Sequence, residues 1–255
     1  MVGTAWELFV VLALVIATGV IALARASAAM IATDDRVAGE SPKRLGSSGS
    51  HGQFDRSVPP TGLDPGVSLL ANVALTHLVI VLVVGGVVWL TRVPTDVLGL
   101  GGRPDLITAV LLGVGTYALN EGFGLATKAL GGVAPERYRE FLAPRDAREW
   151  VVLLVVVLPI LAFGEELLFR GMLVGGLAAA TGLSPWVLVG LSSVAFGAAH
   201  TAQGRLGMVV TGLLGIVLAA AFVVTGDLLL VAIAHYLVNA LEFVVHEGLG
   251  VEWPA

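Results

Sequence analysis

Two adjacent glutamates and an arginine interrupt an otherwise apolar stretch of the sequence. Residues 163–172 read FGEELLFRGM and follow the run VVLLVVVLPILA. A charged side chain near the centre of a bilayer costs about 2.5 to 3.5 kcal/mol, so these charges require compensating partners or a function. Glu166 and Arg170 share one helix face and can neutralise each other. Glu165 points in another direction and has no cation on its own helix, which makes it a candidate general base.

Polar groups also occur in later apolar stretches. In AFGAAH, Phe196 precedes His200 by one helical turn, so the aromatic ring can fix the imidazole and keep water from one side of it. In AHYLVNALEFVVH, His235 and Asn239 lie on one helix face. Both can direct hydrogen-bond donors to one point, as an oxyanion site requires.

Glu165, His200, His235 and Asn239 together are suited to activating a water molecule and stabilising a tetrahedral oxyanion. A hydrolase is therefore the chemical interpretation. The alternative is a transporter or scaffold in which the same groups only satisfy one another between helices. Glu165, His200 and His235 also have the ligand count of a catalytic zinc site. Asparagine is a poor zinc ligand and the sequence has no H-E-x-x-H motif, so no cofactor is assigned and Zn stays an open alternative.

Other polar residues in the apolar stretches receive simpler interpretations. His77 is interpreted as a packing residue, because no other polar residue shares its helix face. Glu121 could line the same cavity or extend a network to Arg170. Glu242 and His246 continue the stripe of His235, but they lie near the predicted helix end, where interfacial exposure explains them.

The elements that would position these residues are membrane-spanning helices. The chain has 255 residues, of which 56% are apolar and 13% charged, and its mean hydropathy is +0.92. Seven apolar windows come near the roughly 17 to 25 residues of a spanning helix. They are residues 6–24, 67–90, 106–130, 150–180, 185–200, 208–226 and 228–245. We predict an all-α, polytopic membrane helical bundle with seven transmembrane helices, or eight if the long fourth window is broken.

Composition also predicts how the chain is divided and which way it faces. Residues 1–66 are predicted to form an N-terminal transmembrane helix and a flexible polar linker, and residues 67–255 a membrane-embedded core. Residues 131–149 suit a surface helix at the headgroups. Basic residues gather in the first and third loops, which places these loops in the cytoplasm and the N-terminus outside. No Lys/Arg-rich stripe suggests a nucleic-acid partner, and the absence of cysteine excludes thiol chemistry.

Three motifs in a fixed order carry a resemblance to a known family. EELLFR fits E-E-x-x-x-R, FGAAH fits F-x-x-x-H, and HYLVN fits H-x-x-x-N, within residues 165–239. Together they resemble the CAAX prenyl protease and bacteriocin-processing (CPBP or Abi) family of intramembrane proteases.

The resemblance implies a glutamate-dependent endopeptidase in the cytoplasmic (cell) membrane. Glu165 and His200 would activate water, while His235 and Asn239 would hold the oxyanion. The supporting residues behind them would be Glu166, Arg170 and Phe196. The partners would be the lipid bilayer and a membrane-anchored or lipidated protein substrate, of which a prenylated C-a-a-X protein is one example.

Overall fold

The described part of the chain is helical throughout. The computed structural model describes residues 2–39, 65–129, 139 and 142–251, and these residues contain no strand. This confirms the all-α prediction. Residues 40–64 of the predicted linker, and residues 131–138 and 140–141 of the surface helix predicted at 131–149, lie outside the described residues.

The helices follow the apolar windows of the sequence closely. The first three are α1 (Val2–Gly39), α2 (Pro65–Thr91) and α3 (Leu106–Ala129). The last three are α8 (Pro185–Ala199), α9 (Gly204–Thr225) and α10 (Leu228–Phe243). A short 3-10 turn, Thr95–Leu98, follows α2, and a second one, Thr201–Gln203, separates α8 from α9. The helix α1 extends beyond its apolar window and ends at Gly39, inside the segment predicted as a linker, residues 33–66.

The fourth window forms one continuous helix over residues 147–181. It contains α5 (Ala147–Val152), α6 (Leu158–Glu166) and α7 (Leu177–Thr181), joined by π-helical segments at Leu153–Val157 and Leu167–Gly176. Pro159 is the second residue of α6, which begins where the first π-helical segment ends. Proline has no backbone N–H to donate, so a local change in the hydrogen-bond pattern at this point is expected. The second π-helical segment begins immediately after Glu166, so both glutamates end a regular helical stretch.

The number of spans predicted from the sequence is not confirmed. In the described part of the chain, six helices are long and apolar enough to cross a membrane. They are Gly3–Ala29, Leu70–Thr91, Leu106–Thr127, Ala147–Thr181, Thr201–Thr225 and Leu228–Gly248. The predicted fifth span is the apolar but shorter helix Pro185–Ala199, and the fourth window is not broken. The chain is thus a multi-pass membrane protein built around these six helices.

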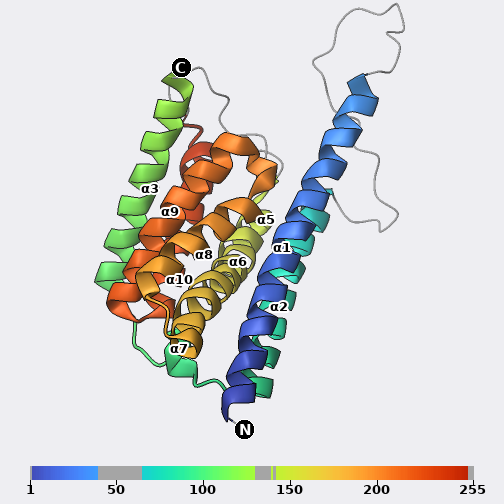
Figure 1. Ribbon diagram of the computed structural model, residues 1–255. Helices are drawn as coiled ribbons and strands as arrows, with labels where there is room; N and C mark the ends of the chain where they lie inside the picture. Colours follow the sequence, from blue (N-terminus) through green and yellow to red (C-terminus); the bar gives the residue numbers. More distant parts are fainter. Residues whose placement is uncertain (1, 40–64, 130–138, 140–141, 252–255) are drawn as a thin grey trace, which may run out of the picture.

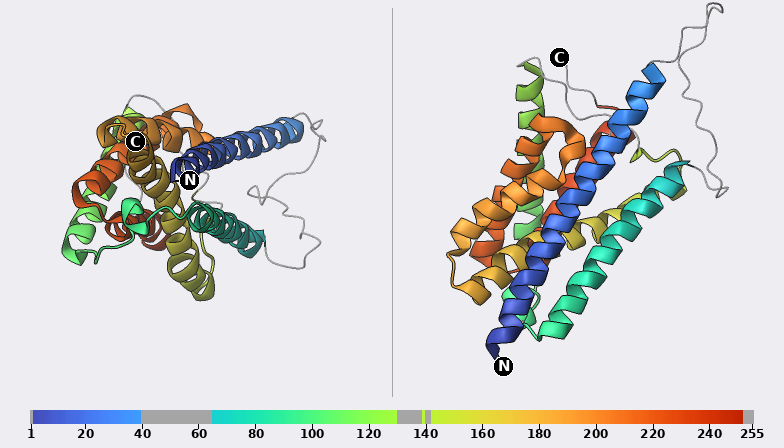
Figure 2. Two further views of the ribbon diagram at one scale, coloured as in Figure 1. Left: turned by 60° about the horizontal axis from the view of Figure 1, so that its bottom comes forward. Right: turned by 45° about the vertical axis from the view of Figure 1, so that its right-hand side comes forward.

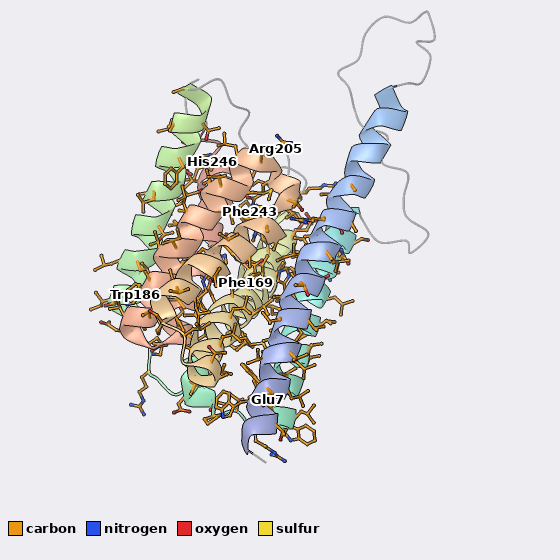
Figure 3. The ribbon with its side chains drawn as sticks, in the orientation of Figure 1. Glu7, Phe169, Trp186, Arg205, Phe243 and His246 are labelled. Atoms are coloured by element: carbon orange, nitrogen blue, oxygen red, sulfur yellow. The ribbon has the colours of Figure 1, made fainter. Side chains whose placement is uncertain are left out.

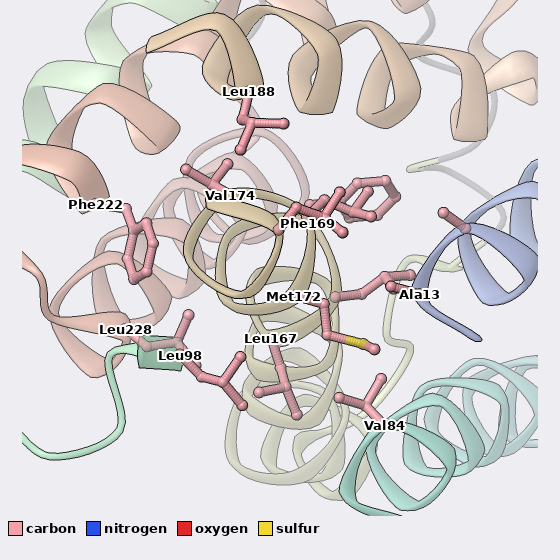
Figure 4. Packing of buried hydrophobic residues seen from close by; sticks show 14 of the residues in the cluster. Ala13, Val84, Leu98, Leu167, Phe169, Met172, Val174, Leu188, Phe222 and Leu228 are labelled. Carbon is pink, nitrogen blue, oxygen red and sulfur yellow. The ribbon is translucent and has the colours of Figure 1, made fainter. Parts of the chain in front are cut away.

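The helix 147–181 lies in the interior of the bundle (Figures 1 and 2). Its middle part contacts α1, α2, α8, α9 and α10. Figure 4 shows Leu167 and Met172 of this helix facing Ala13 of α1 and Val84 of α2, and all four are buried. Large apolar side chains such as Ile107, which is 73% exposed, cover the outer surface, as a lipid-facing surface requires.

Short connections close the bundle at its ends. The Asp227 carboxylate accepts a hydrogen bond of 3.0 Å from the Leu230 N–H and so caps α10. Gly226 ends α9 with a φ of 65°, a left-handed conformation that favours glycine. Glu7 lies near one end of the bundle, whereas Arg205 and His246 lie near the other (Figure 3).

Helix α3 packs closely on α10 through a glycine. A Cβ atom added to Gly113 would lie 2.8 Å from the Leu237 Cβ and 2.9 Å from the Ala234 carbonyl oxygen. Two residues later, a Cβ on Gly115 would meet nothing within 4 Å. The close approach matters for function because α10 carries His235 and Asn239.

We expect Gly113→Ala to destabilise the protein by about 1 to 3 kcal/mol, the usual cost of forcing a methyl group into a packed contact. Gly115→Ala is the matched control on the same helix and should leave stability unchanged or slightly raised. Thermal unfolding of both variants in detergent measures the difference. Equal unfolding temperatures for the two variants would show that α3 and α10 do not approach in this way.

Candidate active site

A cavity of about 570 Å³ runs from the middle of the bundle to the end that carries His246. Its inner wall includes Glu165, Phe196, His200, His235 and Asn239. These five residues come from three separate helices, 147–181, α8 with its C-terminal cap, and α10. The structure therefore brings the four predicted catalytic residues and Phe196 to one cavity.

The two adjacent glutamates have different surroundings. Glu166 and Arg170 are fully buried, and Nη1 of Arg170 donates a hydrogen bond of 2.9 Å to Oε1 of Glu166. Nη2 of Arg170 donates to the Gly215 carbonyl on α9 at 3.0 Å. His235 on α10 adds a third contact, because its Nδ1 donates to the same Oε1 atom at 2.7 Å. Glu166 thus holds one cation of its own helix and one ring of another.

Glu165 faces the cavity and is surrounded by imidazole rings. Its Oε1 lies 3.8 Å from Nε2 of His200, and its Oε2 lies 3.6 Å from Nε2 of His235. Both separations are too long for a direct hydrogen bond, and at such separations a bridging water molecule is the arrangement to consider. Oε2 makes no hydrogen bond within the described part of the chain, so this oxygen keeps its capacity to accept a proton.

Backbone and carboxylate contacts fix the orientation of the two predicted catalytic histidines. Nδ1 of His200 lies 2.8 Å from the Phe196 carbonyl oxygen, which can only accept, so Nδ1 carries a proton. Nδ1 of His235 is bonded to Glu166 in the same manner. In each neutral ring, Nε2 is then the atom with the free lone pair, and in both rings Nε2 faces Glu165.

Phe196 packs against several of these groups at once. Its ring centroid lies 4.6 Å from that of His200 and 5.9 Å from that of His235. The Arg170 guanidinium lies 4.5 Å from the same ring centroid, within the range of a cation–π contact. The sequence-based expectation that Phe196 would stack on His200 agrees with this geometry, but the contact with Arg170 was not foreseen.

Asn239 lies one helical turn after His235 and lines the same cavity. Within the described part of the chain its side chain makes no hydrogen bond, so its amide N–H₂ is available as an oxyanion donor in this cavity.

The interpretation of His77 as a packing residue was wrong. Its Nε2 lies 3.3 Å from Oε1 of Glu165, so His77 on α2 is a direct neighbour of the predicted base and not merely a packing residue. Periodicity along α2 could not reveal this contact, because the partner is 88 residues away in sequence.

A second polar cluster lines the outer part of the cavity. Nε2 of His246 lies 3.1 Å from Oε1 of Glu121, while Glu242 accepts hydrogen bonds of 2.8 Å from both Asn120 and Arg139. Interfacial exposure therefore does not explain Glu242 and His246, which are half-buried partners of other side chains. Glu121 lines the cavity, which was one of the two expectations for it, and it contacts His246.

The three residues that would bind zinc in the alternative interpretation lie near one another but not as close as a second group of ligand atoms. In the part of the chain that is described, one set of three ligand atoms lies within 4.8 Å of one another, and it belongs to Glu121, Glu242 and His246. Glu165, His200 and His235 are not among the sets of ligand atoms found this close together. We therefore derive no step through zinc.

The comparison with protein families agrees with the three motifs. Residues 147–241 match the family model described as Type II CAAX prenyl endopeptidase Rce1-like. The segment is similar to the Rce1-like family. It contains Glu165, His200, His235 and Asn239, whereas His77 lies outside it. No curated protein and no solved structure matches the chain.

The match confirms the resemblance found on the sequence. An Rce1-like segment within a set of apolar helices implies a membrane protease whose substrate is a protein in the membrane.

Removing the cation of the buried pair should destabilise the Rce1-like segment. Arg170→Ala leaves Glu166 buried with only His235 as a partner, and we expect a loss of about 3 to 5 kcal/mol. Arg205→Ala, an exposed arginine at the end of the bundle, is the control and should change stability little. The readout is thermal unfolding of the purified proteins in detergent. Similar unfolding temperatures for the two variants would contradict a structural role for Arg170.

Proposed function

We propose that this protein is an intramembrane endopeptidase that cleaves a membrane-anchored or lipidated protein substrate. In this proposal Glu165 and His200 activate the attacking water molecule, and His235 with Asn239 stabilises the oxyanion. The observation that carries the proposal is the position of the Glu165 carboxylate inside the cavity, 3.8 Å and 3.6 Å from the Nε2 atoms of two rings on other helices.

The chemistry follows from the contacts of each group. A water molecule between Glu165 and His200 loses a proton to the carboxylate while its oxygen attacks the carbon of the scissile carbonyl. The carbonyl oxygen then becomes an oxyanion, and the Asn239 amide donates a hydrogen bond to it. His235 adds a second donor when its Nε2 carries a proton, since Glu166 holds Nδ1 and aims the opposite edge of the ring at the site. Glu165 returns its proton to the leaving amine as the C–N bond breaks.

The lining of the cavity supports an apolar substrate. Around the polar groups, the walls are formed by aliphatic side chains that include Leu70, Val157, Leu161, Leu206, Val210 and Leu214. Such a lining suits a lipid chain or an apolar peptide segment. A prenylated C-a-a-X protein is the substrate class that the family description names, and we adopt it as the first candidate.

We further propose that the cavity opens toward the cytoplasm and that the protein resides in the cytoplasmic membrane. Arg139 and Arg205 lie at the end of the bundle that carries the cavity. The arginines of the third loop also indicate the cytoplasmic side, because cytoplasmic loops carry an excess of basic residues. In this arrangement residues 67–255 are the protease core, and residues 1–66 are an added helix and linker.

Glu165→Gln is the direct test of the proposal. A quenched fluorescent farnesylated C-a-a-X peptide is offered to the protein in liposomes, beside the same peptide without the lipid. We expect cleavage to fall by about 100- to 10,000-fold, because the general base is lost while the fold remains. Glu7→Gln, which changes an exposed glutamate at the far end of the bundle, should cleave as the unaltered protein does.

Other outcomes separate the competing classes. A transporter or scaffold with the same polar cavity would cleave neither peptide, whatever residue stands at position 165. Loss of cleavage after dialysis against a strong chelator, restored by added Zn²⁺, would replace the metal-independent route with a zinc enzyme. Cleavage by Glu165→Gln at the original rate would refute the role of Glu165.

A further inference from the structure

His77 makes the shortest contact between a ring nitrogen and the Glu165 carboxylate. The distance from its Nε2 to Oε1 is 3.3 Å, compared with 3.8 Å for His200 and 3.6 Å for His235. His77 belongs to α2, which lies outside the Rce1-like segment. The three motifs therefore assign it no role.

The second ring nitrogen of His77 determines where the protons lie. Nδ1 is 2.8 Å from the Val73 carbonyl oxygen, and a carbonyl can only accept, so Nδ1 carries a proton. A hydrogen bond between Nε2 and the Glu165 carboxylate then requires a second proton on the ring, because a carboxyl group that already carried this proton could not act as the proposed base. The ring donates to Oε1, and that oxygen of the carboxylate is held by the bond.

The packing of α2 against α6 keeps this pair together. A Cβ atom added to Gly164 would lie 3.2 Å from the His77 carbonyl oxygen, so the two helices meet closely beside Glu165. The His77 side chain is 15% exposed and that of Glu165 is 12% exposed, so bulk water competes little for the contact. At 3.3 Å the contact is long for a hydrogen bond between charged groups, so its contribution is to orient Oε1 and not to supply a large energy.

We propose that His77 is a positioning residue of this active site, which holds Oε1 of Glu165 and so fixes the carboxylate that takes the proton from water. This inference rests on the proposed function. His200 and His235 face the same carboxylate from beyond hydrogen-bond distance, which leaves them available to water and substrate. His77 is not part of the cavity wall, so its effect is exerted through Glu165.

The test compares His77→Leu with His77→Gln in the liposome assay with the farnesylated C-a-a-X peptide. Leucine removes the hydrogen bond, and we expect kcat to fall by up to about 100-fold, the loss typical of a misaligned reacting group. KM should stay unchanged, because substrate does not touch His77. Glutamine can still donate to Oε1 and should recover a large part of kcat. Thr91→Val is the matched control, since it removes a buried polar group at the far end of α2.

Other results of this experiment would overturn either the role of His77 or the proposed function. Unchanged kcat in His77→Leu, in a protein whose Glu165→Gln variant is inactive, overturns the inference and leaves the proposed function standing. Equal kcat values for His77→Gln and His77→Leu also overturn it. The inference is overturned as well if the fall in activity only matches a smaller fraction of folded protein and the same fall occurs in Thr91→Val. If His77→Leu does not fold, His77→Met takes its place. Absence of cleavage by the unaltered protein removes the proposed function, and the inference with it.

Discussion

The fully buried ion pair between Glu166 and Arg170 is the interaction on which the rest of the site depends. A charge in the interior of a membrane protein is tolerated only when partners neutralise it, and this pair meets that condition at 2.9 Å. Its remaining contacts then reach three other helices, through the Gly215 carbonyl on α9, the Phe196 ring on α8 and the His235 ring on α10. These contacts offset the free-energy cost of burying the charges, and they fix the positions of the neighbouring groups.

The two glutamates are adjacent in the sequence, and for this reason their side chains face different surroundings. One residue corresponds to about 100° of rotation on a helix, so Glu166 can face the protein interior while Glu165 faces the cavity. The π-helical segment that begins at Leu167 follows both residues, and such segments frequently occur at functional sites. Two carboxylates of the same kind therefore have different chemistry because of their surroundings, one as a structural anion and the other as the proposed base.

The sequence predicted most of the bundle and the four central residues of the cavity. The apolar windows located the helices, and the spacing of EELLFR predicted the Glu166–Arg170 contact, because both depend on local periodicity. The role of His77 could not be predicted in this way, since it arises from the approach of α2 to α6 at Gly164. The bonds of Glu242 and His246 to residues 120, 121 and 139 were missed for the same reason. The span count is not confirmed, because the fifth window was already short in the sequence and forms the helix Pro185–Ala199 of 15 residues.

The central claim is that Glu165 and His200 share one water molecule inside a lipid-embedded protein. An experimental structure of the protein in a lipid environment, at a resolution that shows ordered solvent, is the most direct measurement. We expect a single water molecule within hydrogen-bond distance of both the Glu165 carboxylate and Nε2 of His200. A direct Glu165–His200 ion pair with no solvent between them, or a metal ion bound by both residues, would contradict it.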